Sequence, residues 1–169
     1  MPFAPKPPSL RARALQALSL REHSRSELRQ KLLRRSRKAD AAVQDDACSR
    51  EARAAEADRL LDELQAQGLL SAERFIESRV HARSARFGNR RIQAELARHG
   101  LQVDPETAES LRRTELERAR AVWVRRYGLA SPDTAPTPAE IARQVRFLAA
   151  RGFSPDIIRR VVKGDSSDE

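Results

Sequence analysis

A short arginine-rich helical pattern that occurs three times constrains this chain more than any single residue does. Residues 88–100 and 24–35 each place two apolar side chains four positions apart among arginines, Ile92 and Leu96 in one copy and Leu28 and Leu32 in the other. Residues 140–152 form a looser third copy. Such repetition indicates stacked helical units, because each unit buries its apolar stripe against its neighbours. We therefore expect an all-α protein without one central active-site pocket.

The charge balance indicates an anionic partner. Of 169 residues, 33 are Lys or Arg and 24 are Asp or Glu, which gives a net charge of +9. A field of that sign attracts nucleic acid, an acidic protein surface or an anionic membrane. Only 4% of the residues are aromatic, and much of the hydrophobic 40% is alanine. This composition disfavours a deep apolar pocket.

Cysteine use and hydropathy predict the compartment. Cys48 is the single cysteine, so no internal disulfide can form and a reducing compartment fits. Residues 1–8 do not have the pattern of a signal peptide, and no apolar run reaches the roughly 18 residues that a membrane span needs. We expect a cytoplasmic protein that does not enter a membrane.

Helix start and stop signals divide the chain into three groups of three helices. A Pro-rich tail at 1–8 precedes a first unit at 9–68, a second at 69–113 and a third at 114–163, and an acidic tail follows at 164–169. Periodicity is lost near 36–49 and at 129–136. We expect an inserted loop at the first segment, part of which lengthens the next helix, and a linker at the second. Five of the six glycines follow a predicted helix, where a left-handed residue is favoured. They are Gly68, Gly100, Gly128, Gly152 and Gly164.

Local patterns predict where helices begin and which faces they bury. Capping boxes are expected at residues 24–27, 114–117 and 137–140. Asp104 and Pro105 combine an N-cap with a proline at the first helical position. Helical spacing predicts buried stripes that include Leu15 near the N-terminus and Val145 near the C-terminus. Trp123 and Tyr127 fall on another such stripe, which favours core packing over a base-stacking platform.

No residue cluster indicates catalysis or a cofactor. The histidines, His23, His81 and His99, are not spaced as helical metal ligands, and Cys48 has no second cysteine to help it bind a metal. The chain has no glycine-rich phosphate-binding motif. Carboxylates lie mostly beside arginines on predicted solvent faces, where ion pairs explain them better than acid–base chemistry. We predict a protein that is not an enzyme, has no catalytic residue and needs no metal or cofactor.

The basic side chains around the short helices are the candidates for binding. They are Arg25, Arg29 and Lys31 in the first unit, and Arg83, Arg86, Arg90, Arg91 and Arg98 in the second. Gly88 and Asn89 open the second of these helices, where free amides and the positive helix end favour an anion. A solvated charged face is the alternative interpretation of each residue. Recurrence in two units of a basic chain favours a partner- or DNA-binding surface.

Four segments, in order, resemble the RecX regulatory family. They are residues 18–33, 64–75, 87–96 and 146–158, and the resemblance extends over about residues 10 to 163. It departs at 36–49, where the family has a short glycine turn, and in the two tails. The resemblance implies three tandem three-helix repeats in an elongated, curved array.

The resemblance also implies a function. Members of the family modulate the RecA recombinase: they bind in the groove of the RecA–single-stranded-DNA filament, inhibit its ATPase, strand exchange and coprotease activity, and favour filament disassembly. We therefore expect a monomeric restraint on recombination and the SOS response that contacts RecA first and single-stranded DNA second. Two alternatives remain: a stand-alone DNA-binding protein with tandem helix-turn-helix-like units, and a structural helical adaptor for another acidic protein.

Overall fold

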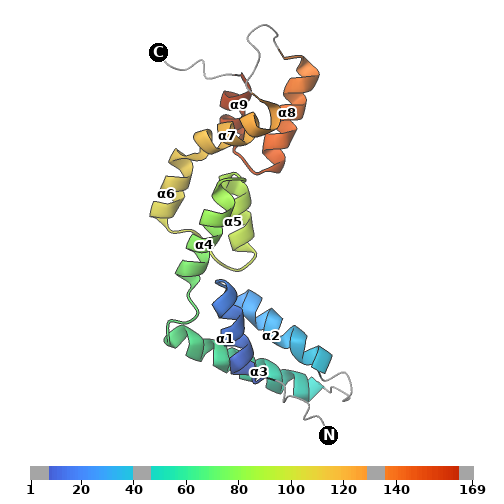
Figure 1. Ribbon diagram of the computed structural model, residues 1–169, viewed down its shortest axis with the longest axis vertical. Helices are drawn as coiled ribbons and strands as arrows, with labels where there is room; N and C mark the ends of the chain where they lie inside the picture. The colour runs from blue at the N-terminus through green and yellow to red at the C-terminus, as the bar shows by residue number, and fades with distance from the viewer. Residues whose placement is uncertain (1–7, 40–46, 129–135, 164–169) are drawn as a thin grey trace. The chain divides into compact units, whose positions relative to one another are not determined.

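The computed structural model describes residues 8–39, 47–128 and 136–163 (Figure 1). Within these ranges the chain forms nine α-helices and no strand, so the all-α prediction is confirmed. The helices are α1 (Leu10–Leu20), α2 (Arg25–Ala39), α3 (Ala47–Ala66), α4 (Ala72–Ser84), α5 (Asn89–Ala97), α6 (Pro105–Arg113), α7 (Glu115–Tyr127), α8 (Pro138–Ala150) and α9 (Pro155–Lys163).

The chain separates into two compact units that divide between Phe75 and Ile76, inside α4. The first unit contains α1 to α3, and the second contains most of α4 together with α5 to α9. The second compact unit therefore includes nearly all of the second and third predicted three-helix groups. The exact boundaries of three separate units stay a prediction.

The core of the first unit is built from leucine and alanine. In α1 the buried residues are Ala14 and Ala17, which pack with Leu28 and Leu32 of α2 and with a stripe on α3 that consists of Leu60, Leu61 and Leu64. Each fully buried leucine contributes about 2 kcal/mol, whereas alanine adds little area. The prediction that Leu15 is buried is wrong, since it is 38% exposed. Ala17 takes that place because it lies three residues after Ala14, on the same helical face.

The second unit has a core around α7, α8 and α9. Ala119 and Val122 of α7 pack with Leu148, Phe153, Ile158 and Val161. Val145 was expected to be buried but is 37% exposed, and Gln144 is buried instead. The Gln144 side-chain oxygen accepts a 3.1 Å hydrogen bond from the Trp123 indole, which gives a partner to the indole N–H and to the amide oxygen. Trp123 packs against this core, in agreement with the core-packing interpretation.

Most predicted helix ends are confirmed. The Thr137 hydroxyl and the Glu140 carboxylate form a reciprocal capping box, and Asp104 accepts a 2.8 Å bond from the Thr107 amide. Ser24 caps α2 by accepting a 3.0 Å bond from the Glu27 amide. Four of the five predicted C-terminal glycines have positive φ, whereas Gly164 and residues 129–135 of the linker predicted at 129–136 lie outside the described residues.

At the predicted insertion near 36–49, α2 continues to Ala39 and α3 begins at Ala47, which agrees with the expectation that part of the segment lengthens the next helix. Residues 40–46 lie outside the described residues. One local prediction of a helix start is wrong. The capping box expected at 114–117 does not form. Thr114 has helical backbone angles, so its hydroxyl faces the preceding turn and donates to the Ser110 carbonyl at 2.9 Å. Helices α6 and α7 therefore meet at a single helical residue.

Candidate functional site

Two of the predicted binding residues on α2, Arg25 and Arg29, form ion pairs within the first unit. Arg29 donates two hydrogen bonds to the Asp58 carboxylate, at 2.7 and 2.9 Å, and Arg25 donates to Asp62 at 2.7 Å. The hydrogen bonds from Arg29 lower the pKa of Asp58, and the same contact raises the pKa of Arg29. These half-exposed pairs fasten α2 to α3 and contribute about 1 kcal/mol at most. Lys31 is exposed and has no hydrogen bond or ion pair with any described residue.

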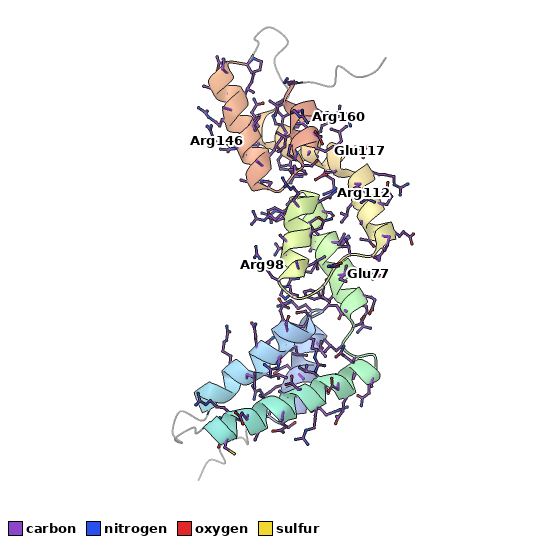
Figure 2. All side chains as sticks on the ribbon, turned by 180° about the vertical axis from the view of Figure 1, so that it is seen from behind. Glu77, Arg98, Arg112, Glu117, Arg146 and Arg160 are labelled. Atoms are coloured by element: carbon purple, nitrogen blue, oxygen red, sulfur yellow. The ribbon has the colours of Figure 1, made fainter. Side chains whose placement is uncertain are left out.

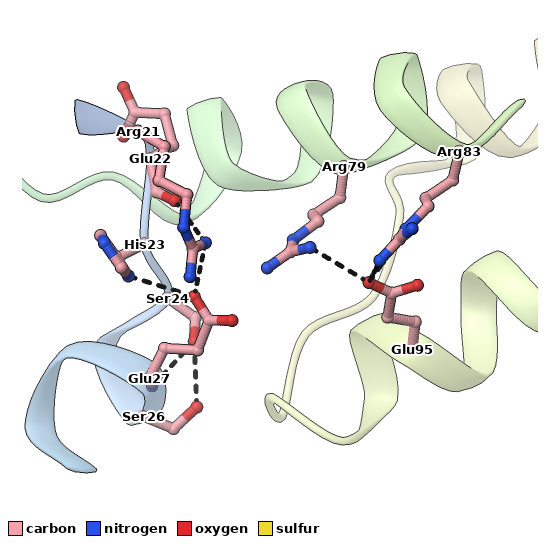
Figure 3. A network of polar contacts seen from close by, with 9 residues as sticks. All are labelled: Arg21, Glu22, His23, Ser24, Ser26, Glu27, Arg79, Arg83 and Glu95. Carbon is pink, nitrogen blue, oxygen red and sulfur yellow. Dashed lines mark hydrogen bonds and ion pairs between the residues drawn. The ribbon is translucent and has the colours of Figure 1, made fainter. Parts of the chain in front are cut away.

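Arg83 is likewise paired inside the second unit. Its guanidinium donates to the Glu95 carboxylate of α5 at 3.1 Å, and Arg79 reaches the same oxygen at 3.3 Å (Figure 3). Arg83 also lies 5.7 Å from the centre of the Phe87 ring. This residue therefore fastens α4 to α5 and has limited freedom to contact a partner.

Arg91 belongs to a junction between α5 and the turn that joins α8 to α9. Its Nη1 donates to the Ala150 carbonyl at 3.0 Å, and its guanidinium stacks 4.4 Å from the Phe87 ring centre. The backbone amides of Gly88 and Arg90 donate to the carbonyls of Arg151 and Gly152, at 3.0 and 3.1 Å. The Arg91 side chain and the backbone at the start of α5 therefore both bind the turn between α8 and α9.

The sequence predicted an anion site at the N-terminus of α5, but groups of the protein itself occupy this helix end. The Asn89 amide donates to Glu115 Oε1 at 3.0 Å, and Glu115 is only 5% exposed. The neighbouring amides are occupied by the α8–α9 turn. A carboxylate of α7 therefore takes the place predicted for an external anion, as the positive end of a helix favours.

Sequence reasoning missed the polar centre of the second unit, which is Arg118. All of its guanidinium nitrogens donate hydrogen bonds, and burial lowers its pKa while the Glu115 carboxylate raises it. The acceptors are Thr114 Oγ1, the carbonyls of Ser84, Phe87 and Leu111, and Asn89 Oδ1, at 2.6 to 3.2 Å. One sequence signal could have indicated that Arg118 is buried. Helical spacing places it on the same face of the helix as Glu115, Ala119 and Val122.

Three predicted binding residues of the second unit remain available. Arg86, Arg90 and Arg98 are exposed, and within the described ranges their guanidinium groups make no hydrogen bond or ion pair. Arg98 projects at the C-terminal end of α5 (Figure 2). The structure therefore divides the predicted set into residues that hold the fold and residues whose charge faces solvent.

Arg86 also borders a cleft that sequence reasoning missed. The other arginines on its wall are Arg125 and Arg126 of α7 and Arg151 after α8. No pattern in the sequence joined them to Arg86, because they come from positions about 40 and 65 residues later and meet only through the packing of α7 and α8.

In the described part of the chain, no group of three or more His, Cys, Asp or Glu side chains is placed to hold a metal ion. None of the helices in those ranges combines the length and apolar character that a bilayer crossing requires. The exposed basic side chains described above are the candidate site of this chain.

Comparisons with known proteins cover nearly the whole chain. A family described as "RecX, third three-helix domain" matches residues 114–162. The regulatory protein RecX of Leptothrix cholodnii is 45% identical, with 92% of this chain and 88% of that protein aligned. The regulatory protein RecX of Ralstonia nicotianae is 42% identical, with 97% and 96% aligned.

A solved structure resembles the fold. The crystal structure of RecX from Lactobacillus salivarius aligns over 92% of this chain and 94% of that chain, with a TM-score of 0.58 and 19% sequence identity. Together with the matched three-helix domain, this likeness fits the prediction of tandem three-helix repeats.

Proposed function

This chain belongs to the RecX family of regulatory proteins, and on that premise we propose that it restrains the RecA recombinase. It binds the RecA–single-stranded-DNA filament, inhibits ATP hydrolysis, strand exchange and coprotease activity, and favours filament disassembly. In this role it limits recombinational DNA repair and the SOS response in the cytoplasm.

The observation that carries the proposal is the similarity to RecX proteins along the whole chain, which includes both compact units. Consecutive helical repeats present similar surfaces at regular intervals, and a filament presents identical protomers at regular intervals. Weak contacts that are linked in this way gain avidity, since each later contact forms within the same complex. A monomer with several repeats therefore needs no single deep binding pocket.

The charge distribution supports an interaction surface on exposed basic residues. Lys31 of α2, and Arg90 and Arg98 of α5, are exposed and form no hydrogen bond or ion pair with the described residues. We assign the main contacts to these three, while Arg25, Arg29, Arg83 and Arg91 act mainly by holding the fold. Long-range attraction between a chain of net charge +9 and the filament accelerates the encounter.

The ATPase of the recombinase tests this function. Purified chain is titrated into RecA from the same organism with circular single-stranded DNA and ATP, and phosphate release is followed. We expect suppression at or below one chain per RecA protomer, because one bound chain affects several protomers. Unchanged ATP hydrolysis at every ratio would remove the proposal.

The unpaired arginines also favour a second candidate function, binding to DNA without any recombinase. This stand-alone mode depends almost entirely on phosphate contacts, so its affinity falls steeply with salt. Filament binding that survives at a salt concentration where bare DNA is released supports the RecA mode. If filament binding and bare-DNA binding are lost at the same salt concentration, the result favours the stand-alone mode.

A further inference from the structure

The second unit contains a cleft of about 210 Å³ that is lined by four arginines and two apolar side chains. Arg86 follows α4, Arg125 and Arg126 lie near the end of α7, and Arg151 follows α8. Val122 and Phe147 complete the wall. Three separate segments of the chain therefore contribute positive charge to one concave surface.

Arg151 is held in place as part of this wall. Its Nη1 donates to the Arg86 carbonyl at 3.2 Å, which links the end of α8 to the turn after α4. Its guanidinium lies 4.8 Å from the centre of the Phe147 ring and 5.9 Å from that of Phe87. Attraction between a cation and an aromatic face favours this arrangement, so Arg151 and Phe147 form a cation–aromatic pair on the wall of the cleft.

The other three arginines of the cleft have no internal partner in the described part of the chain. Arg86, Arg125 and Arg126 are exposed, and no carboxylate lines the cleft. Elsewhere in the same unit arginines are commonly paired, as Arg83 is with Glu95 and Arg112 is with Glu109. Like charges gathered in a concave surface raise the local positive potential, and an anion relieves their mutual repulsion.

We propose that this cleft binds the phosphodiester backbone of single-stranded nucleic acid. Arg86, Arg125 and Arg126 donate to phosphate oxygens, for which the planar guanidinium is well suited. The pair of Arg151 and Phe147 contacts a base, since single strands offer bases for stacking beside their phosphates. An acidic protein segment brings carboxylates but no base, so the combination of guanidinium groups with an aromatic side chain on the wall favours nucleic acid.

The inference adds a site to the proposed function, in which the strand is the DNA inside the filament. Binding to a bare strand is nevertheless a property of this chain alone. It is therefore tested without RecA, and its failure is distinct from failure of the ATPase test. Inhibition of RecA ATPase without cleft-dependent strand binding overturns the inference and leaves the function intact.

The test uses the full chain and a fluorescein-labelled thymidine oligomer of about 20 nucleotides, a length that exceeds typical single-strand sites. Anisotropy gives the dissociation constant at several salt concentrations. The cleft variant is the triple substitution Arg86→Gln, Arg125→Gln, Arg126→Gln. The control variant removes the same charge at exposed positions outside the cleft, Arg50→Gln, Arg59→Gln, Arg113→Gln. Circular dichroism checks that both variants are folded.

We expect the cleft variant to bind the oligomer at least about tenfold more weakly, with a salt slope reduced by roughly 2, because each lost phosphate contact removes about 0.7 of slope. The dissociation constant and salt slope of the control variant should stay close to those of the wild type. Equal weakening in the two variants shows an effect of net charge only and overturns the inference. An unlabelled polyglutamate peptide that competes as well as the oligomer, charge for charge, also overturns it. Single substitutions Arg125→Gln and Arg126→Gln each give part of the loss if the triple variant is unfolded.

Discussion

Gly88 and Gly152 lie against each other so closely that neither position has room for a Cβ atom. A Cβ on Gly88 would collide with the backbone of Gly152 and Phe153, and one on Gly152 would collide with Arg91. The start of α5 thereby reaches the α8–α9 turn, and the Gly88 amide donates to the Arg151 carbonyl at 3.0 Å. This backbone junction joins the helices of the middle of the chain to its last three helices.

Gly88→Ala should destabilise the second unit by about 1–3 kcal/mol, since the added methyl meets backbone that cannot rotate away. Gly88 has φ −77°, so the alanine suffers no conformational strain and the cost is steric. Urea unfolding gives the free energy, and hydrogen exchange should be faster at the amides of residues 88 and 90.

Gly100→Ala is the matched control. Gly100 has φ +73° with open space around it, so alanine costs roughly 1–2 kcal/mol through backbone strain alone. Exchange at the amides of residues 88 and 90 should then keep its wild-type rate. A Gly88→Ala protein as stable as the wild type would disprove the close junction.

Arg118→Met should reduce the free energy of unfolding by about 2–4 kcal/mol, because it leaves Asn89 and several carbonyls without their donor. Arg118→Lys keeps the charge but offers three donors in place of a planar fork, so we expect it to recover only part of the loss. Arg113→Met, at an exposed position, should change stability by less than about 0.5 kcal/mol. Full recovery with lysine would mean that charge and not geometry matters here.

The stability of the first unit should depend on pH through His23, which is 2% exposed. Burial, then Arg21 and Lys31, lower its pKa below the usual 6.5. The Glu27 carboxylate, which lies 3.2 Å from His23 Nδ1, opposes the shift of this pKa (Figure 3). The unfolded chain therefore takes up the proton first as the pH falls. Stability should decline below about pH 6.5, by at most about 1.4 kcal/mol per pH unit, and level off below the folded-state pKa.

His23→Gln removes this titration. Urea unfolding at about pH 7.5 and 5.5 should show a smaller pH effect in the variant than in the wild type. An identical pH dependence in the two proteins would show that His23 titrates alike in the folded and unfolded states.

Reversal of charge at Arg90 and Arg98 should weaken inhibition of RecA without loss of helical circular dichroism. These side chains face solvent, so their replacement by glutamate costs the fold little. With glutamine at both sites, Arg25→Gln with Arg29→Gln should weaken inhibition less than Arg90→Gln with Arg98→Gln, since the guanidinium groups of Arg25 and Arg29 already contact Asp62 and Asp58. A stronger effect from Arg25 and Arg29 would place the contact on α2.

Helix ends and most buried stripes could be predicted because their causes are local. Thr137 with Glu140, and Asp104 before Pro105, cap helices through neighbours within three residues. The leucines at 28 and 32 follow helical spacing onto one face, and both are buried. Such features need no knowledge of what lies across the core.

The division of the arginines could not be predicted, since it depends on partners far along the chain. Arg29 finds Asp58 across 29 positions, and Arg91 finds the Ala150 carbonyl across 59. The predicted anion site at Asn89 is filled by Glu115 for the same reason. Composition showed an excess of positive charge, but only packing decides which charges remain for a partner.

Direct binding to the filament is the measurement that tests the central claim. Cys48 is exposed and is the single cysteine, so one fluorophore can be attached there and its anisotropy followed. RecA filaments on single-stranded DNA, free RecA and bare single-stranded DNA are titrated in turn at physiological salt. We predict the tightest binding to the filament, weakened by Arg90→Glu with Arg98→Glu. Equal affinity for filament and bare strand, or no binding to the filament, would contradict the account.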